Sequence, residues 1–150
     1  MQYWLFKSEP NCYSIDDMKR DKKTLWDGVR NYQARNFMRE MRVGDRGLFY
    51  HSSTIPAGVV GTVVVSKNAL PDLTQFDPKS DHPDPKSNPA DPRWDCVELT
   101  FDTMLSRTVT LNEIKQKKAF SHLQLVQKGN RLSVLPVDKK HYDQIIKMAQ

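Results

Sequence analysis

Residues 57–66, AGVVGTVVVS, are the segment that most narrows the possible folds of this chain. Valine occupies five of its ten positions, and the apolar run is nearly continuous. β-Branched side chains fit a pleated strand, and a strand buried on both faces carries such a run. We therefore predict a central strand of a β-sheet here, with the other elements arranged around it.

Four further segments have the composition of strands. Residues 3–6, YWLF, predict a buried N-terminal strand, because aromatic and branched residues favour a pleated surface. Residues 47–51 predict a strand that precedes the valine segment. Apolar and polar residues alternate over 97–102, as in a half-exposed strand. Residues 131–137, RLSVLPV, predict a short strand or extended segment that Pro136 stops.

Helices are predicted from caps and from apolar residues spaced three and four apart. Ser14 begins a short helix with acids in its first turn, and Thr110–Glu113 has a capping-box pattern. A second helix is expected from Ala34, and Asp138 is expected to cap a last one. The apolar faces are Ala34, Phe37, Met38 and Met41 in the former and Tyr142, Ile145, Ile146 and Ala149 in the latter.

Residues 71–92 hold six of the nine prolines and several Asp-Pro pairs. Proline removes a backbone donor and restricts the residue before it, so this stretch predicts a long irregular excursion. No repeat or linker divides the chain. Residues 1–150 are therefore expected to form a single α+β domain with a small, mixed, mostly antiparallel β-barrel-like sheet and short peripheral helices.

The charge of the chain is basic and unevenly distributed. Its net charge is +5, and Lys and Arg exceed Asp and Glu by 10 to 7 in residues 1–52 and by 9 to 3 in residues 105–150. Residues 53–104 hold 4 basic and 8 acidic side chains. A polyanion would therefore meet surfaces built from the two ends, although solubilising charge explains the pattern equally well.

Cysteine content and hydropathy bear on the cellular compartment. The two cysteines, Cys12 and Cys96, lie far apart and lack metal-ligand spacing. No apolar run has the length of a membrane span, and the first residues do not resemble a secretory signal. We expect no membrane association, two reduced thiols, and a cytoplasmic location, or a nuclear one in a eukaryote.

No pattern in the sequence commits the chain to catalysis. His51 and Ser52 place a base beside a hydroxyl, but neighbours on a strand point to opposite faces. The string Asp81-His82-Pro83-Asp84 lacks further ligands at metal spacing. Glycine-rich phosphate loops and dinucleotide fingerprints do not occur. We therefore expect no catalytic residue, no metal and no cofactor.

Residues 26–37, WDGVRNYQARNF, concentrate aromatic, amide and guanidinium groups. Arg35, Arg39 and Arg42 would form an outward basic stripe on the predicted helix, suited to phosphate or simply to water. Trp26 precedes that helix in a loop, where a tryptophan is more often core than ligand platform. Its neighbours favour the second interpretation, since an aromatic plane with amide and guanidinium donors can stack on a base and read its edge.

Several motifs along the chain closely resemble the EVE domain family. They are YWLFKSEP (3–10), YSIDD (13–17), WDGVRNYQARNF (26–37), VGD (43–45), FYHS (49–52), PDLTQFDPKS (71–80), PRW (92–94) and RLSVLPV (131–137). The resemblance spans essentially the whole chain. It implies a PUA-like fold related to YTH and ASCH domains, and recognition of modified bases in DNA, particularly modified cytosines.

The resemblance also implies a set of ligand-binding residues. Trp26 would be a wall of an aromatic cage and Asn31 an amide that reads the base edge, while Arg35 would point toward phosphate. The second aromatic wall stays open between Tyr32, Tyr50 and Phe49. The remaining candidates are Ser8 (with Lys7 beside it), His51, Ser52, Arg131 and Ser133, each of which has a purely structural alternative, such as an Arg131–Glu9 ion pair.

The main hypothesis from the sequence is a non-catalytic module that holds a modified base, in DNA or in RNA, in an aromatic pocket. Two alternatives stay open. One is an enzyme that acts on a modified nucleotide with His51 as general base, and the other is a small-molecule or protein-binding module that uses the same pocket. The kind of modification and the oligomeric state do not follow from the sequence.

Overall fold

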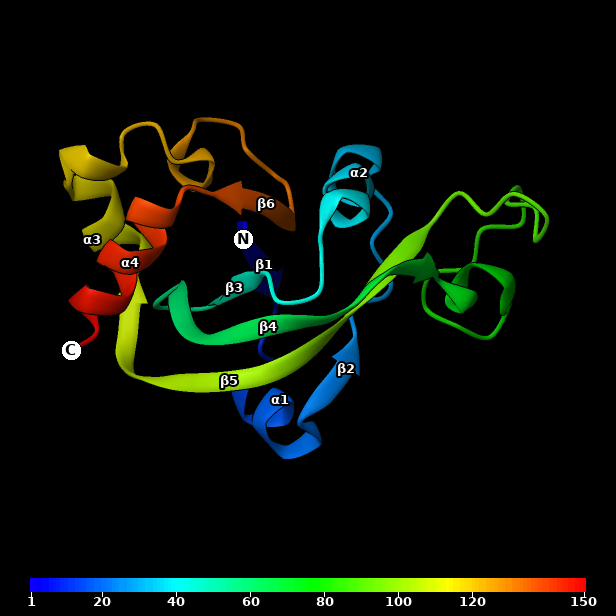
Figure 1. The fold of residues 1–150 in the computed structure, drawn as a ribbon, viewed down its shortest axis with the longest axis horizontal. Coiled ribbons are helices and arrows are strands. Elements are labelled where there is room, and N and C mark those ends of the chain that lie inside the picture. The colour runs from blue at the N-terminus through cyan, green and yellow to red at the C-terminus, as the bar shows by residue number, and fades with distance from the viewer.

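The computed structural model describes residues 1–150 as one six-stranded mixed sheet surrounded by short helices (Figure 1). The strands are β1 (Tyr3–Ser8), β2 (Lys23–Leu25), β3 (Arg46–His51), β4 (Gly58–Pro71), β5 (Asp95–Thr110) and β6 (Val134–Val137). The helices are α1 (Ile15–Asp21), α2 (Tyr32–Glu40), α3 (Leu111–Gln116) and α4 (Lys139–Met148). Three 3-10 helices cover Leu73–Phe76, Lys118–Phe120 and Gln124–Val126.

The strand order is β2-β5-β4-β3-β1-β6, which confirms the valine segment as an interior strand. Only β1 and β3 are parallel; every other pair is antiparallel. The long β4–β5 pair bends across the molecule (Figure 1), and its register shifts at several bulges, which increase twist and bend a ribbon. The α+β class and the mostly antiparallel sheet are thus confirmed. The sheet is curved but open, with β2 and β6 at its edges.

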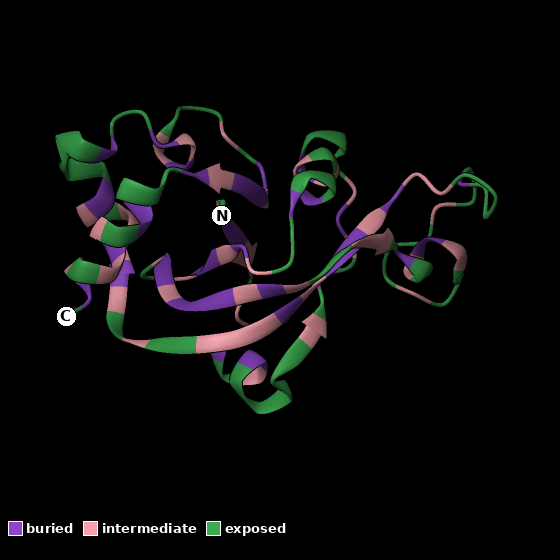
Figure 2. Cartoon of the chain, viewed as in Figure 1, coloured by how far each residue is buried: buried purple, intermediate pink, exposed green.

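Apolar residues of the sheet and of the helices form one core. Val59, Val63 and Val65 of β4 have no exposed surface, and neither do Ala34 and Met38 of α2. Figure 2 shows the buried class running along β4, whereas the loop beyond its far end is largely exposed. The helix faces predicted from the spacing of apolar residues therefore pack inward, with Phe37 and Ile146 only half-buried.

The elements differ from the predictions at several places: β4 and β5 run on to Pro71 and Thr110, well beyond the predicted 57–66 and 97–102, and the short strand β2 was not predicted. α2 begins at Tyr32 rather than Ala34, because the Asn31 side chain caps it by accepting a hydrogen bond from the Ala34 N–H at 2.9 Å. Pro136 lies inside β6 and does not stop the strand, since an edge strand tolerates a missing donor. The cap predicted at Ser14 and the capping box predicted at Thr110 are confirmed, and Ser14 also forms a capping box, whereas Asp138 is the N-cap residue of α4 without a side-chain capping bond.

The proline-containing excursion after β4 is organised by one buried amide. Gln75 is 1% exposed; its Nε2 donates to the carbonyls of Asp72 and Trp94, and its Oε1 accepts from the Trp94 N–H and the Ser87 hydroxyl. A single side chain thus satisfies the Trp94 N–H and adds a second hydrogen bond to each of two carbonyls just beyond the end of the β4–β5 pair. The loop is irregular, as predicted, yet its base is fixed against the sheet.

Candidate functional site

A cavity of about 620 Å³ opens where β1 and β2 end. Its lining comes from the end of β1 and the turn after it, from β2 and the loop that follows, from the proline-containing excursion, and from the residue just before β6. The lining residues are Lys7, Ser8, Glu9, Cys12, Tyr13, Thr24, Leu25, Trp26, Asp27, Gly28, Val29, Arg30, His82 and Ser133. This volume lies within the range of roughly 300–1,000 Å³ that is usual for small-ligand pockets.

Two aromatic rings make a corner of this cavity. Trp26 is only 9% exposed; its ring packs edge-on against Phe6 and Phe49, with centroids 5.6 Å away in both cases. Tyr13 stands at 78° to Trp26 with the centroids 6.4 Å apart. The Tyr13 hydroxyl donates to Asp21 at 2.9 Å, and burial together with this bond raises the pKa of Tyr13 to about 12. Trp26 is therefore both a core residue and a cavity wall.

The loop that carries Trp26 is held in place by the buried carboxylate of Asp72. Asp72 accepts hydrogen bonds from the Gly28 N–H at 2.8 Å and from Arg30 Nη1 at 3.0 Å, and it also caps Leu73–Phe76 through the Thr74 N–H. Burial alone would raise the pKa of Asp72, but the bonds from Thr74, Gly28 and Arg30 outweigh burial and lower it. The carboxylate therefore stays ionised and clamps the cavity wall to the end of β4.

His82 reaches the cavity from the proline-containing excursion. Arg30 Nη2 donates to the His82 carbonyl at 2.7 Å, which ties that loop to the Trp26 loop. Gly28 has φ +80°, and a Cβ built on it would lie 2.7 Å from the His82 ring. Glycine is thus required for the backbone conformation and for the close approach of His82.

A second cavity of about 500 Å³ lies next to the first. Arg30 and Ser133 line the first cavity, whereas their chain neighbours Asn31 and Leu132 line the second, so the two cavities adjoin along two chain segments. Amide and basic side chains dominate the second lining, and no acidic residue contributes to it. Its residues are Asn31, Gln33, Gln124, Gln127, Lys128, Gly129, Asn130, Arg131 and Leu132.

The residues predicted from the sequence are divided between these cavities and other positions. Ser8, Trp26 and Ser133 line the first cavity, and Asn31 and Arg131 line the second. The other five line neither. The Arg131–Glu9 pair considered above is not formed; the Glu9 carboxylate instead accepts from the Ser53 hydroxyl at 3.2 Å.

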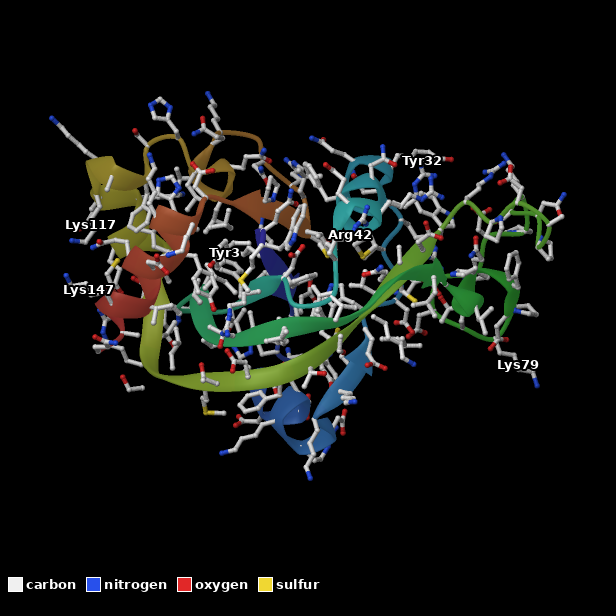
Figure 3. All side chains as sticks on the ribbon, in the orientation of Figure 1. Tyr3, Tyr32, Arg42, Lys79, Lys117 and Lys147 are labelled. Atoms are coloured by element: carbon white, nitrogen blue, oxygen red, sulfur yellow. The ribbon has the colours of Figure 1, made fainter.

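Tyr32 and Arg35 lie on the outer side of α2. The exposed ring of Tyr32 stacks on Trp94 with centroids 4.8 Å apart, and the Arg35 guanidinium lies 4.8 Å from the Tyr32 centroid. Figure 3 shows Tyr32 beside α2, on the side toward the proline-containing loop. Arg35 donates to the Arg93 carbonyl, Arg39 pairs with Asp95, and Arg42, which lies beyond the end of α2, donates to the Met41 carbonyl at 3.1 Å, so the predicted stripe is not a row of free guanidinium groups on the helix.

None of the three aromatic residues proposed as a second wall lines the first cavity. Tyr50 is 3% exposed and lies under Lys7, while Phe49 packs behind Trp26. The rings that line the cavity with Trp26 are those of Tyr13 and His82, which were not among the predicted ligand-binding residues. Tyr13 had a usable signal, since it begins the YSIDD motif. No sequence signal pointed to His82, because the fold alone brings the excursion to this wall.

His51 and Ser52 support the first turn after β1. The Ser52 N–H donates to the Ser8 carbonyl at 3.0 Å, and His51 Nε2 accepts a hydrogen bond from the Ile15 N–H at 3.1 Å. Burial lowers the pKa of His51, while nearby Asp16 opposes this shift. The neutral ring is therefore the form that fits the fold.

This arrangement predicts a pH dependence of stability. The pKa of His51 is lower in the folded chain than in the unfolded chain. The contribution of the neutral ring to the free energy of unfolding is therefore complete above about pH 6.5 and is lost as the pH falls through the folded-state pKa. His51→Gln keeps an acceptor but cannot titrate, so its melting temperature should fall less than that of the wild type between pH 7.5 and 5. Identical pH profiles for the two proteins would contradict this role.

Comparison with known proteins identifies the family of the chain. The sequence profile described as the EVE domain matches residues 2–148. The chain belongs to the EVE domain family. Thymocyte nuclear protein 1 of Mus musculus is 39% identical to this EVE domain over 99% of the chain and 74% of the mouse protein.

Solved structures show the same architecture. A Pseudomonas putida protein is 42% identical and superposes with a TM-score of 0.96 over 99% of both chains. The human THYN1 protein, crystallised in complex with 5-methylcytosine-containing DNA, is 35% identical with a TM-score of 0.94 over 100% of this EVE domain and 98% of the human chain. The predicted PUA-like α+β fold agrees with these neighbours. In this EVE domain, no helix combines the length and apolar character that crossing a membrane requires.

Proposed function

We propose that this EVE domain is a non-catalytic DNA-binding module that receives one modified cytosine in the 620 Å³ cavity. The observation that carries the proposal is the corner made by Trp26 and Tyr13, beside which the polar side chains of Lys7, Asp27 and Ser133 line the cavity. Support also comes from the human THYN1 protein, which was crystallised with 5-methylcytosine-containing DNA and shares this fold. A methyl group on the base would fill apolar space against the rings and gain the free energy of burial.

Energetics require contacts beyond the base. Stacking on an aromatic side chain contributes about 1–3 kcal/mol per base, whereas extruding a base from a duplex costs a few kcal/mol. The second cavity offers Lys128, Arg131 and amide groups without any acid, and it adjoins the first. We therefore place the flanking phosphates there. Such binding should weaken as salt increases.

Titration tests this function directly. Oligonucleotides that carry 5-methylcytosine should bind more tightly than the same sequences with unmodified cytosine, and matched RNA strands report whether RNA competes. Equal affinity for modified and unmodified DNA would contradict the proposal. If the domain shows no preference between the two DNAs but binds a free nucleoside or a protein ligand, the small-molecule or protein-binding alternative is favoured.

Arg131→Ala should weaken binding to modified and unmodified DNA by similar factors. Arg131 lies in the second cavity, away from the aromatic corner, so its loss removes a phosphate contact and leaves base preference intact. The slope of log K against log salt should fall by about 0.9. Arg20, which pairs with Asp17 and Asp21 on α1 and lines neither cavity, provides the matched control as Arg20→Ala. A changed 5-methylcytosine preference in the Arg131 variant would contradict this assignment.

The position of His51 argues against the enzyme alternative. A general base must reach the proton that it removes. His51 does not line the cavity, and its Nε2 lone pair is occupied by the Ile15 N–H. His51→Gln should therefore bind modified DNA as the wild type does, and incubation with modified oligonucleotides should leave them chemically unchanged.

A further inference from the structure

Asp27 is the carboxylate of the first cavity that has no partner. It follows Trp26 directly, lines the cavity and keeps exposed surface, and its side chain is hydrogen-bonded only by its own backbone N–H. Partial desolvation and the nearby Asp72 charge raise the pKa of Asp27, and the charges of His82 and Arg30 oppose this shift. A ligand that brought a hydrogen-bond donor to this carboxylate would relieve the cost of its charge.

Of the charged groups around Asp27, the His82 ring shares the lining without a hydrogen bond to it, whereas Arg30 and the other lining carboxylate, Glu9, are already engaged. Arg30 directs its donors to the carbonyls of Val29 and His82, to Asp72 and to the Thr74 hydroxyl. Glu9, the second carboxylate of the lining, accepts from the Ser53 hydroxyl and lies 3.9 Å from the Cys12 thiol. Asp27 is therefore the acceptor that the cavity keeps available.

Donors are available across the same cavity. The Lys7 ammonium lies 5.9 Å from the Tyr50 ring centroid, and burial lowers the pKa of Lys7 with no carboxylate contributing. Ser133 lies beside Lys7, because the backbone N–H of Lys7 donates to the Ser133 carbonyl at 2.8 Å. The lining thus combines one free acceptor-only group with free donors.

A free carboxylate can distinguish 5-methylcytosine from thymine, which the two aromatic rings alone cannot do. 5-Methylcytosine and thymine carry the same methyl group, so they fill apolar space equally. Cytosine presents an N4 amino donor where thymine presents the O4 acceptor. An ionised carboxylate can only accept, so it attracts the first group and repels the second.

We propose that Asp27 is the specificity-determining residue of the cavity, which accepts a hydrogen bond from the N4 amino group of the bound cytosine and excludes thymine. This assignment rests on the proposed function. It adds an edge-reading contact to the methyl contact made by the rings. A hydrogen bond of this kind discriminates between bases by about 10- to 100-fold.

The test compares two oligonucleotides that differ at one position, 5-methylcytosine against thymine, each opposite an abasic site so that neither base must be unpaired. The wild type should bind the 5-methylcytosine strand at least about tenfold more tightly. Asp27→Asn should bring the two affinities within about threefold, because its amide can donate to thymine O4. Asp143→Asn, which alters an exposed carboxylate of α4 that lines neither cavity, should keep the wild-type ratio.

The outcomes separate the role of Asp27 from the proposed recognition of modified cytosine. If Asp27→Asn keeps the wild-type ratio while 5-methylcytosine is still preferred over unmodified cytosine, Asp27 does not read the base and the proposed function stands. If the wild type binds neither strand, both are overturned. The Asp27 side chain contacts no other residue through a hydrogen bond, so Asp27→Asn should melt close to the wild-type temperature.

Discussion

Asp72→Ala is expected to destabilise the fold by about 3–5 kcal/mol and to abolish binding of modified DNA. The carboxylate has no exposed surface, and its removal leaves the Gly28 N–H and the Thr74 N–H without their acceptor and Arg30 without its counter-charge. An unpaired and largely buried cation is the costliest part of this loss. The loop of Trp26 and Asp27 would then lose its attachment to the end of β4. Urea unfolding and oligonucleotide titration measure the two effects.

Asp102→Ala provides a control for the removal of a carboxylate. Asp102 accepts from Arg46 and Thr62, lines neither of the two cavities, and has a side chain that is 30% exposed. We expect a loss of stability of no more than about 1 kcal/mol and unchanged DNA binding, because partly exposed ion pairs contribute little. If Asp72→Ala binds modified DNA as well as Asp102→Ala does, Asp72 does not position the cavity wall.

The sheet and the helix starts follow from local rules that the sequence displays. The valine run became the interior strand β4, and the capping patterns at Ser14 and Thr110 became real capping boxes. Each of these features depends on residues within a few positions of one another. For the same reason the edge strand β6 was placed less well, since tolerance of Pro136 depends on where the strand lies in the sheet.

The base of the excursion could not be predicted in this way. Gln75 bonds to Trp94, 19 residues away, and Asp72 bonds to Gly28, 44 residues away. Proline content showed that the stretch lacks regular structure, but it contains no information about which distant backbone groups a buried amide or carboxylate will satisfy. These long-range bonds are also the ones that shape the cavity.

The candidate site was predictable to the extent that it lies in one segment. Trp26 was selected because aromatic, amide and guanidinium residues cluster after it, and it does line the cavity. The partners of that cluster were not predictable, because Tyr32 and Arg35 turn outward onto Trp94 while Tyr13 and His82 arrive from other elements. A pattern along the chain shows which groups are present, whereas the sheet order decides which of them face one another.

Trp26→Ala should remove the preference for modified cytosine and lower affinity by about 1–3 kcal/mol, since a base would lose its stacking surface. The same change should cost about 3–5 kcal/mol of stability, because Trp26 also packs against Phe6 and Phe49. Titration well below the melting temperature, with circular dichroism to confirm folding, separates the two effects.

Phe120→Ala is the control that makes this result interpretable. Phe120 is fully buried against His141, lines neither cavity, and should cost a similar amount of stability when truncated. If both variants lost the preference for 5-methylcytosine, the effect of Trp26→Ala would reflect general destabilisation, and Trp26 would be core alone. If only the Trp26 variant lost it, the ring would act on the base directly, because the two proteins would be equally destabilised and would differ only at the cavity wall.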